Sequence, residues 1–332
     1  MNRISNKINR LTIDTLFSFN LEQLFLSKKK GGVILCYHGV DKIGEKRFNM
    51  RFYNVESLRK QFIWLKKNTN VISVNDFFNK KNWINSKLNV AITFDDGYRN
   101  NFKYLKPLAE QLQIPISIYI TGINNTKYNF LWPDFADLVL YHTNQKKFQL
   151  GQSSFNKNNL NQFVDENGHS LKQRIKMEGH WHYKEDFFKL FENEFNQLKL
   201  KSDLADYWQL MSDDEIRECS KSTWITIGSH GFFHNNLDRI PLADALNELN
   251  LSKSYLENLT QKDINELAYP DGAYSEELAE HAFLDLDFKY QLALTFHHSM
   301  DCHKNYLRSR LDMYPVYSDA YQLYKIIPTI QE

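Results

Sequence analysis

The sequence predicts a parallel α/β fold. Short β-rich runs recur along the chain, and longer segments with helical periodicity separate them. The runs within 89–122 and 223–229 are apolar on both faces, as strands buried in a parallel sheet should be. This alternation favours strands joined by helices over an all-β or all-helical fold.

Seven runs are expected to form strands. They cover residues 31–39, 70–74, 89–97, 114–122, 223–231, 265–272 and 290–296. The intervening segments read as ordinary amphipathic helices, because 55–68 and 242–259 place apolar residues three and four positions apart.

Residues 124–220 interrupt the alternation. Their first part is rich in Asn, Gln, Lys and Ser and lacks recognisable strand pairs, whereas the later part has helical periodicity. We therefore expect a largely helical insertion, a lid or subdomain, within a domain that spans 31–315.

The segment 1–30 is expected to be helical, with one broad apolar face bounded by Lys28, Lys29 and Lys30. Such a face more often packs on its own domain, and peripheral contact with a membrane is the alternative. Polar residues interrupt its apolar positions, so it resembles neither a signal peptide nor a spanning helix. We expect a cytoplasmic location, with any membrane contact at the inner face, and a C-terminal tail at 316–332.

Charge and cysteine content restrict the class of protein. Lys+Arg 41 against Asp+Glu 40 gives a formal charge of +1, so no nucleic-acid partner is expected. Cys36, Cys219 and Cys302 are odd in number and far apart, which favours reduced thiols over a disulfide framework.

Chemically active side chains follow two of the expected strands. The run 91–94 leads into the adjacent Asp95 and Asp96, and the run 223–229 leads into His230 and His234. A helix cap with a solvated turn is the simplest reading of an aspartate pair alone. However, the carboxyl ends of the strands of an α/β barrel share one face, so the two groups are expected to converge.

One carboxylate and two imidazoles are a common ligand set for a catalytic divalent cation. We expect one such ion per chain, with Zn²⁺ favoured and Co²⁺, Ni²⁺ or Mn²⁺ as alternatives, and no second comparable cluster. The other aspartate is then free to accept a proton from water.

These residues resemble the motifs of the polysaccharide deacetylase family, carbohydrate esterase family 4, which shares the NodB homology domain. Residues 93–97 match its T-F-D-D-G motif, 229–234 match S-H-x-x-x-H, and 268–274 resemble its third motif. The resemblance covers roughly 31–315. It implies a distorted (β/α) barrel of about seven strands, in agreement with the seven runs.

The resemblance also implies roles for single residues. Asp95 corresponds to the general base, and Asp96, His230 and His234 correspond to the metal ligands. The backbone N–H of Asp271 corresponds to a donor to the oxyanion.

Two features depart from the family pattern. Ala268 stands where the family carries an arginine that braces the catalytic aspartate, and Arg310 resembles an arginine that a related branch supplies. The usual acid motif is not cleanly present. His297, His298 and His38 are the candidates for the acid, and a structural role is at least as well supported for each.

The expected reaction is metal-dependent hydrolysis of an N-acetyl group on an amino sugar of a polysaccharide or glycan precursor. A lipid-linked or nucleotide-linked precursor in surface-polysaccharide synthesis is one such substrate. Removal of a formyl group, or carbohydrate binding without catalysis, are the alternatives. Tyr98, Trp132, Tyr269 and Tyr274 are candidates to stack on sugar rings, with packing as the other explanation.

Overall fold

Parallel strands form a closed barrel at the centre of the molecule. The structure is a computed structural model that describes residues 31–44, 48–160, 162–294 and 304–315. Within these residues, seven strands close in the order β1-β13-β12-β11-β10-β6-β5, because β5 pairs back onto β1. Their bounds are β1 Gly31–Tyr37, β5 Leu88–Phe94, β6 Ile116–Ile120, β10 Ile225–Ser229, β11 Glu266–Ala268, β12 Tyr290–Leu294 and β13 Leu307–Asp312. The predicted barrel is confirmed.

The seven barrel strands are not the seven that the sequence predicts. The run 70–74 contributes only the two-residue β4, Asn70–Val71, which pairs with the start of β5 outside the closed circuit. Its place is taken by β13, which joins β12 to β1. The sequence of β13, LRSRLD, escaped prediction because two arginines interrupt its apolar residues.

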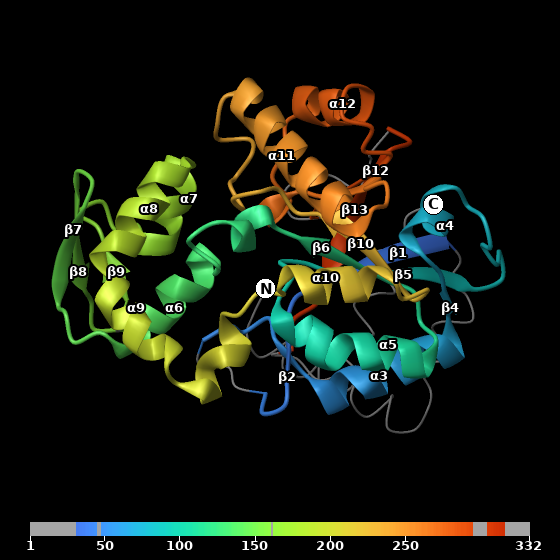
Figure 1. Cartoon of the computed structure of the whole chain (residues 1–332), viewed down its shortest axis with the longest axis horizontal. Helices are drawn as coiled ribbons and strands as arrows, with labels where there is room; N and C mark the ends of the chain where they lie inside the picture. The colour runs from blue at the N-terminus through green and yellow to red at the C-terminus, as the bar shows by residue number, and fades with distance from the viewer. Residues whose placement is uncertain (1–30, 45–47, 161, 295–303, 316–332) are drawn as a thin grey trace, which may run out of the picture.

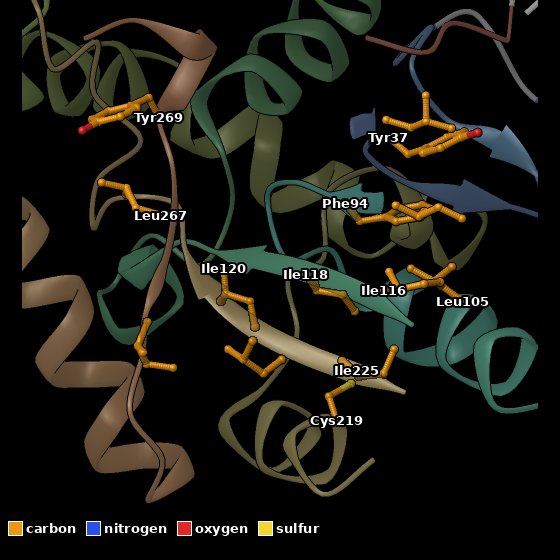
Figure 2. Packing of buried hydrophobic residues seen from close by; sticks show 14 of the residues in the cluster. Tyr37, Phe94, Leu105, Ile116, Ile118, Ile120, Cys219, Ile225, Leu267 and Tyr269 are labelled. Carbon is orange, nitrogen blue, oxygen red and sulfur yellow. The ribbon is translucent and has the colours of Figure 1, made fainter. Parts of the chain in front are cut away.

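Alternate strand residues pack on opposite faces of the barrel wall. Ile34, Ala91, Tyr119 and Leu292 belong to one small apolar cluster, whereas their neighbours belong to a larger cluster shared with the surrounding helices. Figure 2 shows part of the larger cluster, which includes Ile116, Ile118 and Ile120 of β6, with Ile225 of β10 beside Ile116 and near Cys219. Both faces are therefore apolar, which explains the continuous hydrophobic runs.

Helices cover the outside of the barrel, with α11 and α12 on one side of it and α3, α5 and α10 on another (Figure 1). The bounds are α3 Val55–Asn68, α4 Val74–Phe78, α5 Lys106–Leu112, α10 Asp213–Ser220, α11 Leu242–Thr260 and α12 Glu276–Leu284. A π-helical turn, Asn101–Leu105, precedes α5, and short β2, Val40–Asp41, pairs with β3, Tyr53–Asn54. No helix of the described ranges combines the length and apolar character that crossing a bilayer requires.

The region between β6 and α10 forms a separate lobe, seen at the left of Figure 1. It contains α6 Trp132–His142, α7 Leu171–Glu178, α8 Trp181–Leu190 and α9 Glu192–Lys199, flanked by 3₁₀ turns at Gly122–Asn125 and Ser202–Tyr207. It also contains an antiparallel sheet of β7 Lys147–Leu150, β8 Ser153–Lys157 and β9 Phe163–Val164.

The sheet shows that the expected lack of strand pairs was wrong. Its strands are short and place alternate polar residues in solvent, so their pattern is weak in an Asn-rich sequence. An aromatic cluster fills the lobe and includes Phe130, Phe135 and Phe188. Phe52 and Tyr98 from the barrel side join the same cluster, so lobe and barrel share packing.

The predicted helical segment 1–30 and the tail 316–332 lie outside the described residues. Cys36 and Cys219 are buried free thiols.

Candidate metal centre and active site

The carboxyl ends of β5, β10 and β11 meet at one end of the barrel, as a parallel barrel requires. Asp95 and Asp96 follow β5, His230 follows β10 directly, and Asp271 lies in a 3₁₀ turn, Pro270–Gly272, after β11. The structure therefore brings the acidic pair and the two histidines together.

Asp96 lies between the two imidazoles. Its Oδ1 is 3.5 Å from His230 Nε2 and 3.2 Å from His234 Nε2. One ligand atom from each of the three residues lies within 4.8 Å of the other two, and all three side chains are buried. Neither carboxylate oxygen of Asp96 has a hydrogen-bond partner among the described residues. Buried carboxylate oxygens without donors are costly, so this donor set fits a divalent cation with nitrogen and oxygen ligands.

The backbone orients each ligand. Asp96 has φ +79° and Gly97 has φ +75°, so the chain turns sharply after β5. A Cβ at Gly97 would lie 3.1 Å from Ile120 Cγ2, so this left-handed position favours glycine both by conformation and by space. The Nδ1 of His230 is 2.7 Å from the carbonyl oxygen of Ala268. As donor to that oxygen, Nδ1 carries the proton and leaves the Nε2 lone pair directed at Asp96.

Asp95 points to a different partner. Nη1 and Nη2 of Arg310 donate to its Oδ1 and Oδ2 at 2.6 and 2.7 Å, and Nη1 also donates to Thr93 Oγ1 at 3.1 Å. Arg310 is fully buried and comes from β13. Asp95 Oδ2 is 3.9 Å from His230 Nε2, so the carboxylate also borders the ligand cluster.

Charged neighbours keep both aspartates ionised. Burial alone would raise the pKa of Asp95, but the Arg310 guanidinium, with smaller contributions from His230 and His38, holds the pKa at about 2. Burial likewise opposes ionisation of Asp96, and His230 and His234, when protonated at Nε2, together with the Arg51 guanidinium hold its pKa well below the ordinary value. Two anions can therefore coexist at adjacent positions because each has its own cationic or polar partner.

A cavity of about 330 Å³ opens beside the ligand cluster, between the barrel and the lobe. Its lining includes His234, Asp271, Trp132, Arg51 and Lys176. Lys176 of α7 donates to Asp271 Oδ1 at 2.6 Å, so the lobe contacts the turn after β11. Burial would raise the pKa of Asp271, but the nearby Lys176 ammonium holds it at about 2.

A second cavity of about 450 Å³ continues along the lobe. Asp137 and Lys172, which form an ion pair at 2.5 Å, line both cavities. Tyr141, Leu160 and Phe163 add apolar surface to the second cavity. The two cavities therefore adjoin at this ion pair, and the second lies farther from the ligand cluster.

The aromatic candidates separate into two groups. Trp132 lines the first cavity. Tyr98 and Tyr269 are fully buried and donate hydrogen bonds to Asp134 and Gln291, and Tyr274 stacks on Tyr269 at a centroid distance of 5.2 Å. These three tyrosines do not line the described cavities, and packing explains their positions.

His38 belongs to a second cluster that the sequence did not suggest. Its ligand atoms lie within 4.8 Å of those of Cys36 and Asp312, so the expectation of no comparable cluster was wrong. Burial raises the pKa of the Cys36 thiol well above its ordinary value, and its Sγ donates to Asp95 Oδ2 at 3.4 Å. A neutral thiol is a poor metal ligand, so this cluster fits a divalent cation less well. Burial, with a contribution from Arg51, lowers the pKa of His38 to about 4. His297 and His298 lie outside the described residues.

Sequence reasoning missed several residues at the site. Arg51 lies 3.8 Å from Asp96 Oδ2, and buried Lys184 of α8 donates to the backbone carbonyl of His234 at 2.9 Å. Neither occurs in a recognisable motif, and both come from segments far from Asp96 and His234 in the chain. Asp134, within the LWPD stretch, accepts hydrogen bonds from Tyr98 and Asn49, and burial raises its pKa to about 7.

Comparison with known proteins agrees with this geometry. A family model described as polysaccharide deacetylase matches residues 84–290, a range that contains the aspartate pair and both histidines but not Arg310. Comparison with curated proteins gives no match.

Solved structures with a similar fold include Streptococcus pyogenes deacetylase PplD, with 12% identity and a TM-score of 0.54 over 90% of this chain and 98% of that one. IcaB from Ammonifex degensii has 13% identity and a TM-score of 0.55, over 90% and 97%. A polysaccharide deacetylase from Bacillus cereus has 16% identity and a TM-score of 0.54, over 90% and 69%. At these identities, the likeness concerns the fold.

Proposed function

The chain belongs to the polysaccharide deacetylase family, and we propose that it is a metal-dependent hydrolase that removes N-acetyl groups from an amino sugar of a glycan or glycan precursor. One observation carries this proposal: Asp96, His230 and His234 form a buried three-residue cluster, and a second carboxylate, Asp95, borders it. The cluster supports a metal site, and the extra carboxylate supports catalysis.

Asp96, His230 and His234 would hold one divalent ion, with Zn²⁺ favoured by the nitrogen and oxygen ligands and Co²⁺, Ni²⁺ or Mn²⁺ as alternatives. When bound, such an ion supplies Lewis acidity, which lowers the pKa of water and polarises an amide carbonyl.

Asp95 is the proposed general base. It is ionised at neutral pH, since its pKa is about 2, and its Oδ1 keeps a lone pair beyond the one that Arg310 uses, whereas its Oδ2 also accepts the hydrogen bond of the Cys36 thiol. Arg310 positions the Asp95 carboxylate and would replace the arginine that other members of the family carry at the position of Ala268. As water attacks the acetyl carbonyl, Asp95 would accept the proton that this water loses.

Asp271 is the proposed oxyanion donor, through its backbone N–H. Its φ of +54° places the turn in a left-handed conformation, and the contact with Lys176 supports that turn. A histidine would protonate the departing amine. His297 and His298 remain the candidates after the last predicted strand, because the lowered pKa of His38 leaves it unprotonated at neutral pH.

The two adjoining cavities support a substrate longer than one sugar. Trp132 borders the metal-site cavity, and Tyr141 and Phe163 border its continuation. We propose that the acetylated sugar enters the first cavity and that the rest of the glycan or precursor lies along the second. Together the cavities fall within the size range of small-molecule sites.

The experiment is an assay of acetate and formate release from a panel of N-acetylated and N-formylated amino sugars and oligosaccharides, with and without a chelator. We expect acetate release that the chelator abolishes and added Zn²⁺ restores. Turnover by a metal-free preparation would overturn the mechanism. Saturable glycan binding without release of either acid would favour the binding protein, and release of formate alone would identify a deformylase.

A further inference from the structure

A buried lysine from the lobe contacts the loop that carries His234. Lys184 lies on α8, Trp181–Leu190, and its side chain is 1% exposed. Its Nζ donates to the backbone carbonyl of His234 at 2.9 Å and to Asn235 Oδ1 at 2.6 Å, and it lies 5.8 Å from the centre of the Trp132 ring. Both acceptors are neutral oxygens, whereas the carboxylates of Glu248 and Asp271 attract the ammonium from farther away.

An ammonium in this position has an energetic cost. Burial disfavours its charged form and lowers the pKa of Lys184 to about 8. Neutral acceptors compensate a buried cation less well than a carboxylate does. A methionine would fill much of the same space without that cost, so packing alone does not explain a lysine here.

The loop also receives support from the barrel side. Glu248 of α11 accepts hydrogen bonds from the backbone N–H of Phe233 at 2.9 Å and from Asn235 Nδ2 at 2.7 Å. Asn235 therefore lies between Glu248 of the barrel and Lys184 of the lobe. The two elements hold the same short segment from opposite sides.

The conformation of His234 makes this support necessary. Its φ is +52°, in the left-handed region that non-glycine residues occupy rarely, at a cost of roughly 1–3 kcal/mol. A residue in this region keeps its conformation only when the surroundings restrain it. The carbonyl that Lys184 binds belongs to this residue, and its imidazole lies 3.2 Å from Asp96.

We infer that Lys184 is a positioning residue for the metal centre, and that the lobe is part of that centre rather than a cover over it. Lys184 fixes the His234 backbone so that Nε2 stays directed at the site shared with Asp96 and His230. The inference rests on the proposed function, because it assigns Lys184 a role toward the metal that this function requires.

Charge and geometry predict opposite effects of removing the ammonium. A nearby positive charge repels a divalent cation, so electrostatics alone predicts tighter metal binding when Lys184 becomes neutral. Loss of positioning predicts weaker binding, by the roughly 10–100-fold that loss of a residue supporting a ligand typically costs. Whether metal affinity rises or falls when Lys184 becomes neutral therefore distinguishes the electrostatic effect from the positioning effect.

The test compares Lys184→Met with Lys189→Met. Lys189 lies on the same helix and is exposed, and within the part of the chain that the structure describes its one ion pair is with exposed Asp186, so its variant loses the same charge without touching the loop. Zn²⁺ affinity is measured by competition with a chromophoric chelator, and the Co²⁺ absorption spectrum reports ligand geometry. We expect Lys184→Met to bind Zn²⁺ 10–100-fold more weakly with an altered Co²⁺ spectrum, and Lys189→Met to match the wild type.

The possible results distinguish failure of the positioning role of Lys184 from failure of the proposed function. If folded Lys184→Met binds Zn²⁺ as tightly as the wild type or more tightly, the positioning role is overturned. This holds even if the variant has a lower Tm, because a loss of stability without a loss of affinity indicates a purely structural role. A wild-type protein that binds no metal overturns the proposed function instead. If Lys184→Met does not fold by circular dichroism, Lys184→Leu, which likewise has no N–H donor, replaces it. Binding by that variant equal to the wild type contradicts the inference, and weaker binding supports it.

Discussion

Replacing Arg310 with methionine should remove the partner of Asp95 while leaving the carboxylate buried. Arg310 is fully buried and donates two hydrogen bonds of 2.6 and 2.7 Å to Asp95. Breaking such a pair from one side costs about 3–5 kcal/mol, because the remaining charge has no compensation. We therefore expect Arg310→Met to lower the free energy of unfolding at pH 7 by this amount.

The pH dependence follows from the depressed pKa of Asp95. Its shift from 3.8 to about 2 corresponds to roughly 2–3 kcal/mol of stability. Because the folded pKa lies below the ordinary value, this stability is fully present above pH 4 and is lost as the pH falls toward 2. In Arg310→Met, burial without the guanidinium should raise the pKa of Asp95, and the acid limb of activity should move to higher pH.

Urea denaturation with a chelator present measures these changes without a contribution from metal binding. Arg308→Met is the control, since Arg308 lies two positions earlier on β13 and its guanidinium contacts the backbone oxygens of Lys304 and Leu307. It should cost about 1 kcal/mol or less. The double variant Arg310→Met/Asp95→Asn removes the stranded charge and should be more stable than Arg310→Met alone. A double variant that is no more stable would refute the account of Arg310 as the partner of a buried anion.

Three further predictions concern the site and the chain ends. Asp96→Asn should weaken metal binding, with activity partly restored by excess metal, whereas Asp95→Asn should keep its metal and lose about 10²–10⁴-fold in kcat; calorimetric metal titration beside acetate-release kinetics decides this division of roles. Tyr141→Ala should raise KM for an oligosaccharide more than for a single acetylated sugar and leave Zn²⁺ affinity unchanged, since Tyr141 lines only the second cavity; an equal effect on both substrates would contradict the proposed path. If the segment 1–30 binds a bilayer, removing residues 1–27 should release the protein from sedimented vesicles without lowering its Tm; a truncated protein that unfolds would favour packing of this segment on its own domain.

The sequence predicted those parts of the fold whose pattern is local. Strands such as β5 and β6 are continuous apolar runs, and their pairing follows from alternation with helices. β13 could not be predicted in this way, because its buried Arg310 becomes favourable only when Asp95 lies opposite, 215 residues away in the chain. The sheet β7–β9 was not predicted, because its apolar residues pack against the helices of the lobe and no local sequence pattern indicates that packing.

The same distinction applies to the site. Asp95, Asp96, His230 and His234 stand at strand ends within recognisable motifs, so their convergence followed from the fold. Lys184 and Arg51 depend on how the lobe and the β2–β3 region lie against the barrel, and the sequence does not encode that placement in a motif. The tyrosines show a further limit of local patterns, since aromatic character alone does not distinguish Tyr269, which is buried, from a residue that faces a ligand.

The left-handed turn at Asp96 has a consequence for proton transfer. It sends two neighbouring carboxylates to separate partners, one to a guanidinium and the other to imidazoles. The pair therefore does not share a proton, unlike two carboxylates that face each other, whose titrations are coupled. Both acids lose their protons far below neutrality, so the pair carries a constant charge of −2 throughout the physiological range. A change of rate between pH 6 and 9 therefore cannot come from this pair, and it must report another group, such as an imidazole, the water of the proposed reaction, Asp134 with a pKa of about 7 or Lys184 with a pKa of about 8.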